Sequence, residues 1–77
     1  MVWLRRYLRS SIASRLRQAR HGLHLAPRLR RWHSAVAGQL VESGPDASLG
    51  RVAVLWLCAV VIDHCVEQVI RAQPSYQ

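Results

Sequence analysis

The feature that most constrains this chain is an uninterrupted apolar run of eleven residues, Val52 to Ile62, which reads VAVLWLCAVVI. Alone it would cover only about half of a ~30 Å hydrocarbon core. Beyond it the pattern splits into a polar and an apolar face at helical spacing, and a helix from Leu49 to Ala72 would be roughly 35 Å long. We therefore predict one long, membrane-embedded helix. A core helix of a soluble helical assembly and an interfacial or re-entrant segment are the alternatives.

The polar face beyond the run carries the first candidate site. A carboxylate that faces lipid at mid-bilayer depth costs on the order of 2.5–3.5 kcal/mol, so these side chains must face a partner or water. We expect them to contact larger subunits of a membrane complex. The predicted subunit-interface residues are Asp63, His64, Glu67 and Arg71. Glu67 and Arg71 also have the spacing of a favourable i,i+4 pair.

Charge is distributed unevenly along the chain. Nine of the eleven arginines precede Val41, and all four acidic residues follow it. The first 34 residues are rich in Arg and Ser and resemble a mitochondrial transit peptide, whereas the missing apolar core region disfavours a secretory signal. Because the chain begins at Met1, we expect this segment to be retained as a structural helix. The predicted division is a basic amphipathic helical arm at 1–44 and an apolar helix with a short polar tail at 45–77.

Apolar residues at helical spacing, together with Gly and Pro at the expected helix ends, predict three helices and an all-α fold. The first has an apolar stripe at helical spacing, which Arg5 and Arg15 interrupt. That stripe is formed by Trp3, Leu4, Tyr7, Leu8, Ile12, Leu16 and Ala19. Gly22 is the predicted end of this helix, and residues 21–27 are predicted to form a kinked linker in which Pro27 keeps Ala26 extended.

The second helix is predicted from about Arg28 to Val41 and the third from about Ala47 to Gln73. Gly44 is expected to end the second helix, and Pro74 the third. Ser43 or Asp46 is expected to cap the third helix at its N-terminus, because the two have approximately the spacing of a capping box. The expected architecture is thus two basic amphipathic helices followed by one long helix, without a compact bundle.

A second candidate site lies at the start of the second helix. Arg28, Arg30 and Arg31 are placed where the helix macrodipole disfavours cations. The arrangement becomes favourable if the three arginines reach phosphates while Trp32 sits at a headgroup boundary. We therefore predict that these four residues contact anionic lipid such as cardiolipin.

The sequence offers no chemistry for catalysis. His64 and Cys65 are adjacent, so on a helix they point about 100° apart and cannot converge on a metal ion. His21 and His24 share a face but have no second pair of ligands. Cys58 and Cys65 would lie about 10 Å apart on one helix, beyond bridging distance. We expect no enzyme activity, no metal, no cofactor and no small-molecule substrate.

The segment Ile62-Asp63-His64-Cys65-Val66-Glu67-Gln68 resembles the acid-x-x-x-acid-Gln run of the smallest cytochrome bc1 subunits, with His64 in place of a basic residue and a shorter apolar run before it. With the basic N-terminal segment, the pattern resembles supernumerary single-pass subunits of mitochondrial inner-membrane complexes, in the respiratory chain or ATP synthase. The resemblance implies a non-catalytic accessory subunit that braces larger subunits. Positive-inside bias places the N-terminal side in the matrix.

The arginine-rich arm also permits a different function. Single-stranded RNA is bound by basic side chains interleaved with aromatic rings that stack on bases. Trp3, Tyr7 and Trp32 lie among the arginines of the arm. A mitochondrial ribosomal protein or another RNA-binding protein, with the apolar helix buried against neighbouring proteins, is therefore the alternative function. A nucleic-acid partner is expected only in that case.

Overall fold

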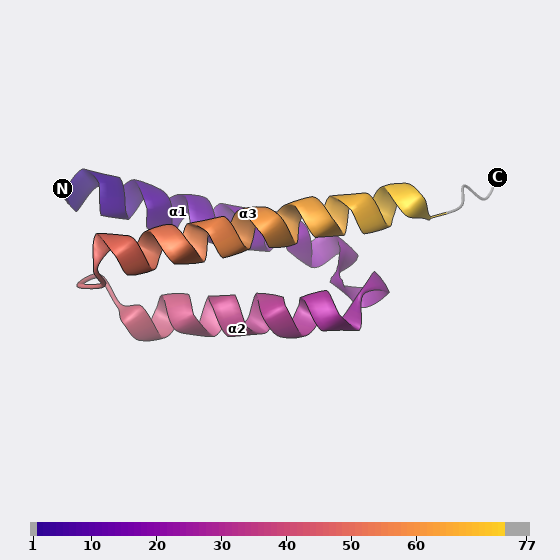
Figure 1. Cartoon of the computed structure of the whole chain (residues 1–77), viewed down its shortest axis with the longest axis horizontal. Coiled ribbons are helices and arrows are strands. Elements are labelled where there is room, and N and C mark those ends of the chain that lie inside the picture. Colours follow the sequence, from indigo (N-terminus) through magenta and orange to yellow (C-terminus); the bar gives the residue numbers. More distant parts are fainter. Residues whose placement is uncertain (1, 74–77) are drawn as a thin grey trace.

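The computed structural model describes residues 2–73, and all of its regular elements are helical. They are the α-helix α1 (Val2–Ala19), the 3₁₀ helix η1 (Arg20–Leu25), and the α-helices α2 (Pro27–Ser43) and α3 (Leu49–Ala72). Figure 1 shows α1 and α3 running in the same direction, with α2 returning antiparallel to both. The predicted all-α fold with a long apolar C-terminal helix is confirmed.

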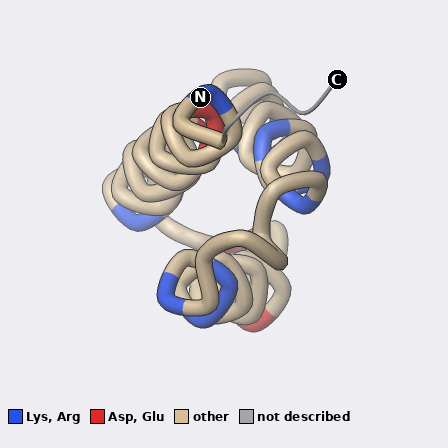
Figure 2. Tube along the Cα trace, turned by 90° about the vertical axis from the view of Figure 1, so that its right-hand side faces the viewer, with Lys and Arg blue, Asp and Glu red and all other residues tan. Residues whose placement is uncertain are grey.

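The three α-helices lie side by side in an elongated molecule. Viewed end on, they sit at the corners of a triangle (Figure 2). The extents are 49 × 20 × 15 Å and the radius of gyration is 13.7 Å. A compact domain of this length has a radius of gyration of about 11.5 Å. The elongated form reflects three long helices that pack side by side around one core. The boundary predicted between residues 44 and 45 falls in the loop between α2 and α3.

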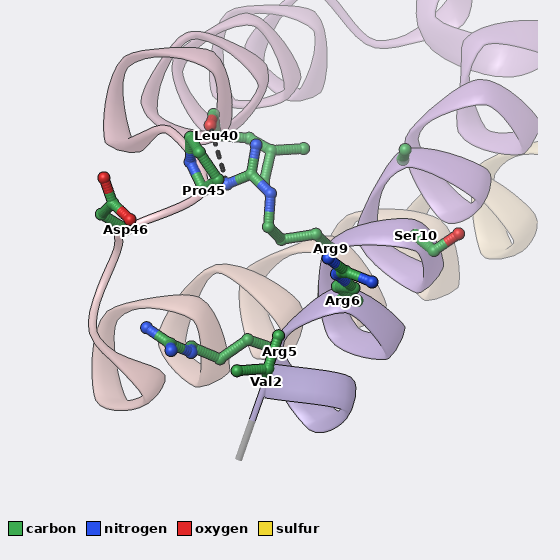
Figure 3. A pocket seen from close by; sticks show the side chains of 9 residues that line it. Val2, Arg5, Arg6, Arg9, Ser10, Leu40, Pro45 and Asp46 are labelled. Carbon is green, nitrogen blue, oxygen red and sulfur yellow. Dashed lines mark hydrogen bonds between the residues drawn. The ribbon is translucent and has the colours of Figure 1, made fainter.

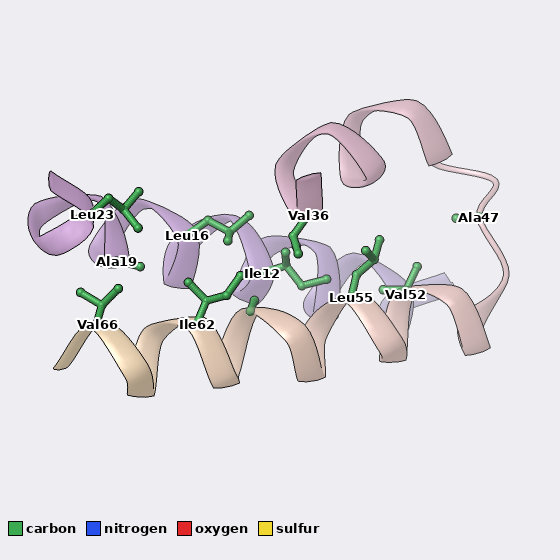
Figure 4. Packing of buried hydrophobic residues seen from close by; sticks show 11 residues of the cluster. Ile12, Leu16, Ala19, Leu23, Val36, Ala47, Val52, Leu55, Ile62 and Val66 are labelled. Carbon is green, nitrogen blue, oxygen red and sulfur yellow. The ribbon is translucent and has the colours of Figure 1, made fainter. Parts of the chain in front are cut away.

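The core is a seam between α1 and α3. The buried residues of α3 follow one another at alternating spacings of three and four, the pattern of a coiled-coil seam. They are Val52, Leu55, Ala59, Ile62 and Val66. From α1 the seam receives Ile12, Leu16 and Ala19, whereas α2 contributes only Val36 among its buried residues (Figure 4). The segment predicted to be a basic arm therefore packs along the apolar helix, because the two stripes match in length and spacing.

The ends of α2 and α3 confirm one predicted signal and correct another. Gly44 follows α2 with a φ of 67°, as expected of a residue that ends a helix. Ser48 caps α3, since its side-chain oxygen accepts a hydrogen bond from the Arg51 amide at 3.2 Å. The prediction that Ser43 or Asp46 caps α3 is wrong, because Ser43 is still helical and its hydroxyl donates to the Gln39 carbonyl. Residues 74–77, with the predicted stop and polar tail, lie outside the described residues.

Gly22 has a different role from the one predicted. α1 ends at Ala19, and Gly22 lies inside η1, buried against α3. A Cβ at this position would lie 2.5 Å from Cγ1 of Val66 and 3.0 Å from Cδ1 of Ile70. The glycine is thus needed for close approach of two backbones, and its prediction as a helix end is wrong. Ala26, before Pro27, is not helical, as the proline requires, but its φ of −145° and ψ of 87° fall short of the fully extended conformation predicted.

Candidate functional site

A polar cluster joins α1 to α3 beside the apolar seam. Nη1 of Arg15 donates to Oδ2 of Asp63 at 3.4 Å, and both side chains are partly buried. The same guanidinium lies over the ring of Trp56, 5.8 Å from its centroid. Nε1 of Trp56 in turn donates to Oγ of Ser11 at 3.2 Å. The arginine that interrupts the apolar stripe of α1 therefore pairs with the carboxylate in the middle of α3.

The four predicted subunit-interface residues separate into two groups. Asp63 is directed toward α1 and pairs within the chain. Arg71 pairs with Glu67 at 2.7 Å, which confirms the predicted i,i+4 pair, and both side chains are exposed. His64 is exposed as well. Contact of these residues with another subunit stays a prediction, and the exposed three are the ones free to make it.

The Arg15–Asp63 pair gives a first testable prediction. In a double-mutant cycle with Arg15→Ala and Asp63→Ala, we expect a coupling free energy of about 0.5–1 kcal/mol, because solvent screens the partly exposed pair. The matched cycle on Glu67 and Arg71 should give about 0.3–0.5 kcal/mol, since that pair is more exposed and local. Urea unfolding measures both. A coupling near zero for the first cycle would mean that the pair does not fix α1 against α3.

The side of α3 that faces away from α1 and α2 is apolar and uncovered. Val54 is 59% exposed, Leu57 56% and Val61 44%. Their spacing of three and four residues places them on one stripe, which we call the outward face. α3 is the one helix among residues 2–73 that is long and apolar enough to cross a membrane, with a mean hydropathy of 1.8 over its best window. Only 28% of that window is buried, whereas a helix in a soluble core is mostly buried.

Two arginines of α1 stabilise the turn between α2 and α3. Nη1 of Arg9 donates to the carbonyls of Leu40 at 3.3 Å and Gly44 at 2.8 Å, and Nη1 of Arg5 donates to the carbonyl of Ala47 at 3.2 Å. The bond from Arg9 to Leu40 is drawn in Figure 3. Carbonyls in the last turn of a helix lack intrahelical donors, and a cation there also complements the macrodipole. These arginines therefore have a structural role that the sequence pattern did not reveal.

The predicted lipid-contact residues are exposed at the start of α2. Their arginine side chains make no hydrogen bond or ion pair within residues 2–73. Their spacing places Arg28, Arg31 and Trp32 on one side of the helix and Arg30 on the opposite side. Trp32 is exposed over somewhat more than a third of its surface. Three of the four predicted residues thus share a face, and their contact with lipid stays a prediction.

A groove between α1 and α2 was not anticipated from the sequence. It consists of two adjoining hollows of about 570 Å³ each, which share Ala13 and Leu40. One hollow ends at Pro45 and Asp46, near the N-terminus of α1 (Figure 3). The other is lined by Leu16, Arg17, Arg20, Leu23, His33, Ser34, Ala37 and Val41. The sequence signal is that Arg6, Arg9, Arg17 and Arg20 recur with Ala13 at helical spacing, a stripe separate from the apolar one.

No cluster within residues 2–73 combines three or more His, Cys, Asp or Glu side chains that could hold a metal ion. Cys58 and Cys65 are free and partly buried, as expected. The surfaces described above are the outward face of α3, the groove and the exposed arginines. Comparisons with protein-family models, curated proteins and solved structures find no match to this chain.

Proposed function

We propose that the protein is a non-catalytic accessory subunit of a mitochondrial inner-membrane complex and attaches to the membrane region through the outward face of α3. The observation that carries the proposal is the exposure of Val54, Leu57 and Val61 on a helix whose apolar window is only 28% buried. Covering these three half-exposed side chains is worth on the order of 3 kcal/mol. A contiguous apolar stripe of this kind marks a contact with acyl chains or another protein.

The packing of α1 on α3 restricts how the chain meets the membrane. If α3 crossed the bilayer with α1 still attached, arginines such as Arg15 and Arg17 would enter the hydrocarbon core at a cost of about 2.5–3.5 kcal/mol each. The proposal is therefore that α3 lies along the membrane boundary with its outward face toward apolar surroundings. α1 and α2 stay on the aqueous side, which we assign to the matrix because the first 34 residues have the composition of an import signal.

Electrostatic attraction adds to the apolar contact. Each Lys or Arg near an anionic membrane surface contributes about 1 kcal/mol. Arg28 and Arg31, exposed on one side of α2 with Trp32, supply such charges and an aromatic ring suited to the headgroup region. The acid-free, Arg- and Ser-rich first 34 residues support mitochondrial location. Anionic lipid such as cardiolipin and a larger membrane subunit are the proposed contacts.

Flotation of the purified protein with vesicles of phosphatidylcholine and cardiolipin tests the proposal. We expect the wild type to float with the vesicles and Val54→Glu to lower the partition coefficient about tenfold, because a charge replaces an apolar contact. Val41→Glu is the matched control, since Val41 is 80% exposed on α2, away from the outward face. Equal flotation of the two variants would contradict the proposed role of α3, and failure of the wild type to float with the vesicles would contradict its membrane attachment.

RNA binding is a second candidate function, which one observation favours. Trp3 and Tyr7 are 69% and 64% exposed and lie one helical turn apart on α1, with the exposed Arg6 beside them. Stacking of a base on an aromatic ring is worth about 1–3 kcal/mol. We expect Trp3→Ala to weaken binding of a single-stranded RNA oligonucleotide at least about fivefold if this function is correct. Absence of salt-dependent RNA binding by the wild type would eliminate this candidate.

A further inference from the structure

The groove between α1 and α2 combines an apolar floor with a basic rim. The floor of the groove includes Leu16 and Leu23, which also belong to the core. The other apolar residues of the floor are Ala13, Ala37 and Leu40. The basic rim is formed by Arg5, Arg6, Arg9, Arg17 and Arg20, and Asp46 is the one acidic residue in the lining of either hollow. Among the described residues, none from α3 lines the groove, which therefore lies apart from the outward face.

We propose that this groove binds an amphipathic helix of a partner protein, with acidic residues along both edges of its apolar stripe. A helix in the groove between α1 and α2 would be a fourth helix beside the three that stand at the corners of a triangle (Figure 2). The alanines at positions 13 and 37 let the partner's backbone approach closely. The partner's carboxylates pair with the rim as e and g residues do in coiled coils.

The distribution of charge along the groove selects a helix as the occupant. Arg5, Arg6 and Arg9 lie toward one end and Arg17 and Arg20 toward the other, with roughly 16 Å of helix between Arg6 and Arg17. A phospholipid concentrates its charge at one end and would leave the other basic end without a partner. The groove follows α1 and η1 for roughly 30 Å, the length of a helix of about 20 residues.

The occupant is a different chain, because no helix of this protein carries the required acids. α1 has none, and α2 has only Glu42. The acids of α3, Asp63 and Glu67, are already paired with Arg15 and Arg71. The side chains of Arg6, Arg17 and Arg20, in contrast, are exposed and make no hydrogen bond or ion pair with any described residue. The rim thus presents unneutralised cations to an acidic partner.

A pair of synthetic helices tests this on the full-length protein. The probe is a fluorescein-labelled peptide of three heptads with Leu at a and d and Glu at e and g, and its counterpart has Lys in place of Glu. Fluorescence anisotropy at low salt should show saturable binding of the Glu peptide, weakened by added NaCl, and no saturable binding of the Lys peptide. Equal binding of both peptides would overturn the proposal.

Charge reversal then locates the site. We expect Arg17→Glu combined with Arg20→Glu to weaken binding of the Glu peptide about tenfold or more, because two attractive contacts become repulsive. Arg28→Glu combined with Arg31→Glu changes the net charge equally on exposed arginines that do not line the groove, and should weaken it less than about threefold. Circular dichroism confirms that each variant is folded. Equal losses in the two double variants would show general charge attraction and overturn the proposal.

Two competing occupants are distinguished in the same assay. Displacement of the Glu peptide by monomeric short-chain phosphatidylglycerol would identify a lipid groove, and sedimentation of the protein alone as a dimer that loses peptide binding would identify a second copy. Either result would overturn the proposal. Val54→Glu should bind the peptide as the wild type does, because Val54 lies outside the groove. Failure of membrane attachment and failure of helix binding are therefore separately visible.

Discussion

Leu55→Ala is expected to lower the free energy of unfolding by about 2–5 kcal/mol, whereas Leu57→Ala, two residues further along α3, should lower it by less than about 1 kcal/mol. Leu55 is 7% exposed in the seam with α1, and Leu57 is 56% exposed on the outward face. Removing the buried side chain forfeits its transfer free energy and leaves a cavity that the rigid helices fill only in part.

Urea unfolding followed by circular dichroism at 222 nm measures both variants. A chain of this size is marginally stable, so in thermal unfolding the midpoint temperature of Leu55→Ala should lie at least about 10 °C below that of the wild type. Because the residue type and the helix are the same, helix propensity cancels between the two variants. Equal losses would mean that the outward face is itself buried in the isolated protein, through self-association, and would contradict the assignment of one core face to α3.

Gly22→Ala is expected to lower the free energy of unfolding by about 1–3 kcal/mol, the usual cost of overpacking a core. The added Cβ would lie 2.5 Å from Cγ1 of Val66, which is buried in α3. A valine in a helix has essentially one χ1 rotamer, so its side chain cannot rotate aside. η1 must therefore move away from α3, and the contact between the two elements is weakened.

Gly38→Ala is the matched control with the opposite sign. Gly38 lies inside α2, and a Cβ there would meet nothing within 4 Å. Alanine in an exposed helix interior should raise the free energy of unfolding by about 0.5–1 kcal/mol. Thermal unfolding of the two variants under one condition gives the comparison. A neutral Gly22→Ala would mean that η1 does not pack against α3 in solution.

Local signals were enough to predict the three α-helices but not the 3₁₀ helix η1, where a linker was expected. α3 begins at Leu49 and ends at Ala72, close to the range from Ala47 to Gln73 that periodicity indicates. Gly44 follows the last residue of α2, as predicted. This position could be predicted because glycine adopts a positive φ more readily than other residues. The N-terminal cap of α3 is Ser48, whereas Ser43 or Asp46 was predicted. The loop before α3 holds several residues that can cap a helix, and only the geometry of the turn decides which of them does so.

The contacts that define the candidate sites could not be predicted, because they join residues far apart in the sequence. Arg15 and Asp63 are 48 positions apart, and Arg9 and Gly44 are 35 apart. The sequence shows that Arg15 interrupts an apolar stripe and that Asp63 needs a partner. It does not show that the two side chains form an ion pair with each other. The arginines that line the groove recur at helical spacing, but the groove also depends on the distance between α1 and α2, which no local pattern encodes.

The hydrogen bonds from Arg5 and Arg9 to the loop before α3 make the first ten residues part of the folded unit. Proteolytic trimming of that segment would remove the hydrogen bond to the Ala47 carbonyl and would leave the Gly44 carbonyl only its 3.4 Å bond from the Ala47 amide. If the protein is imported into mitochondria, as we propose, these hydrogen bonds are absent while the chain passes through a translocase. The helices can then pack on one another only after the N-terminus has been released.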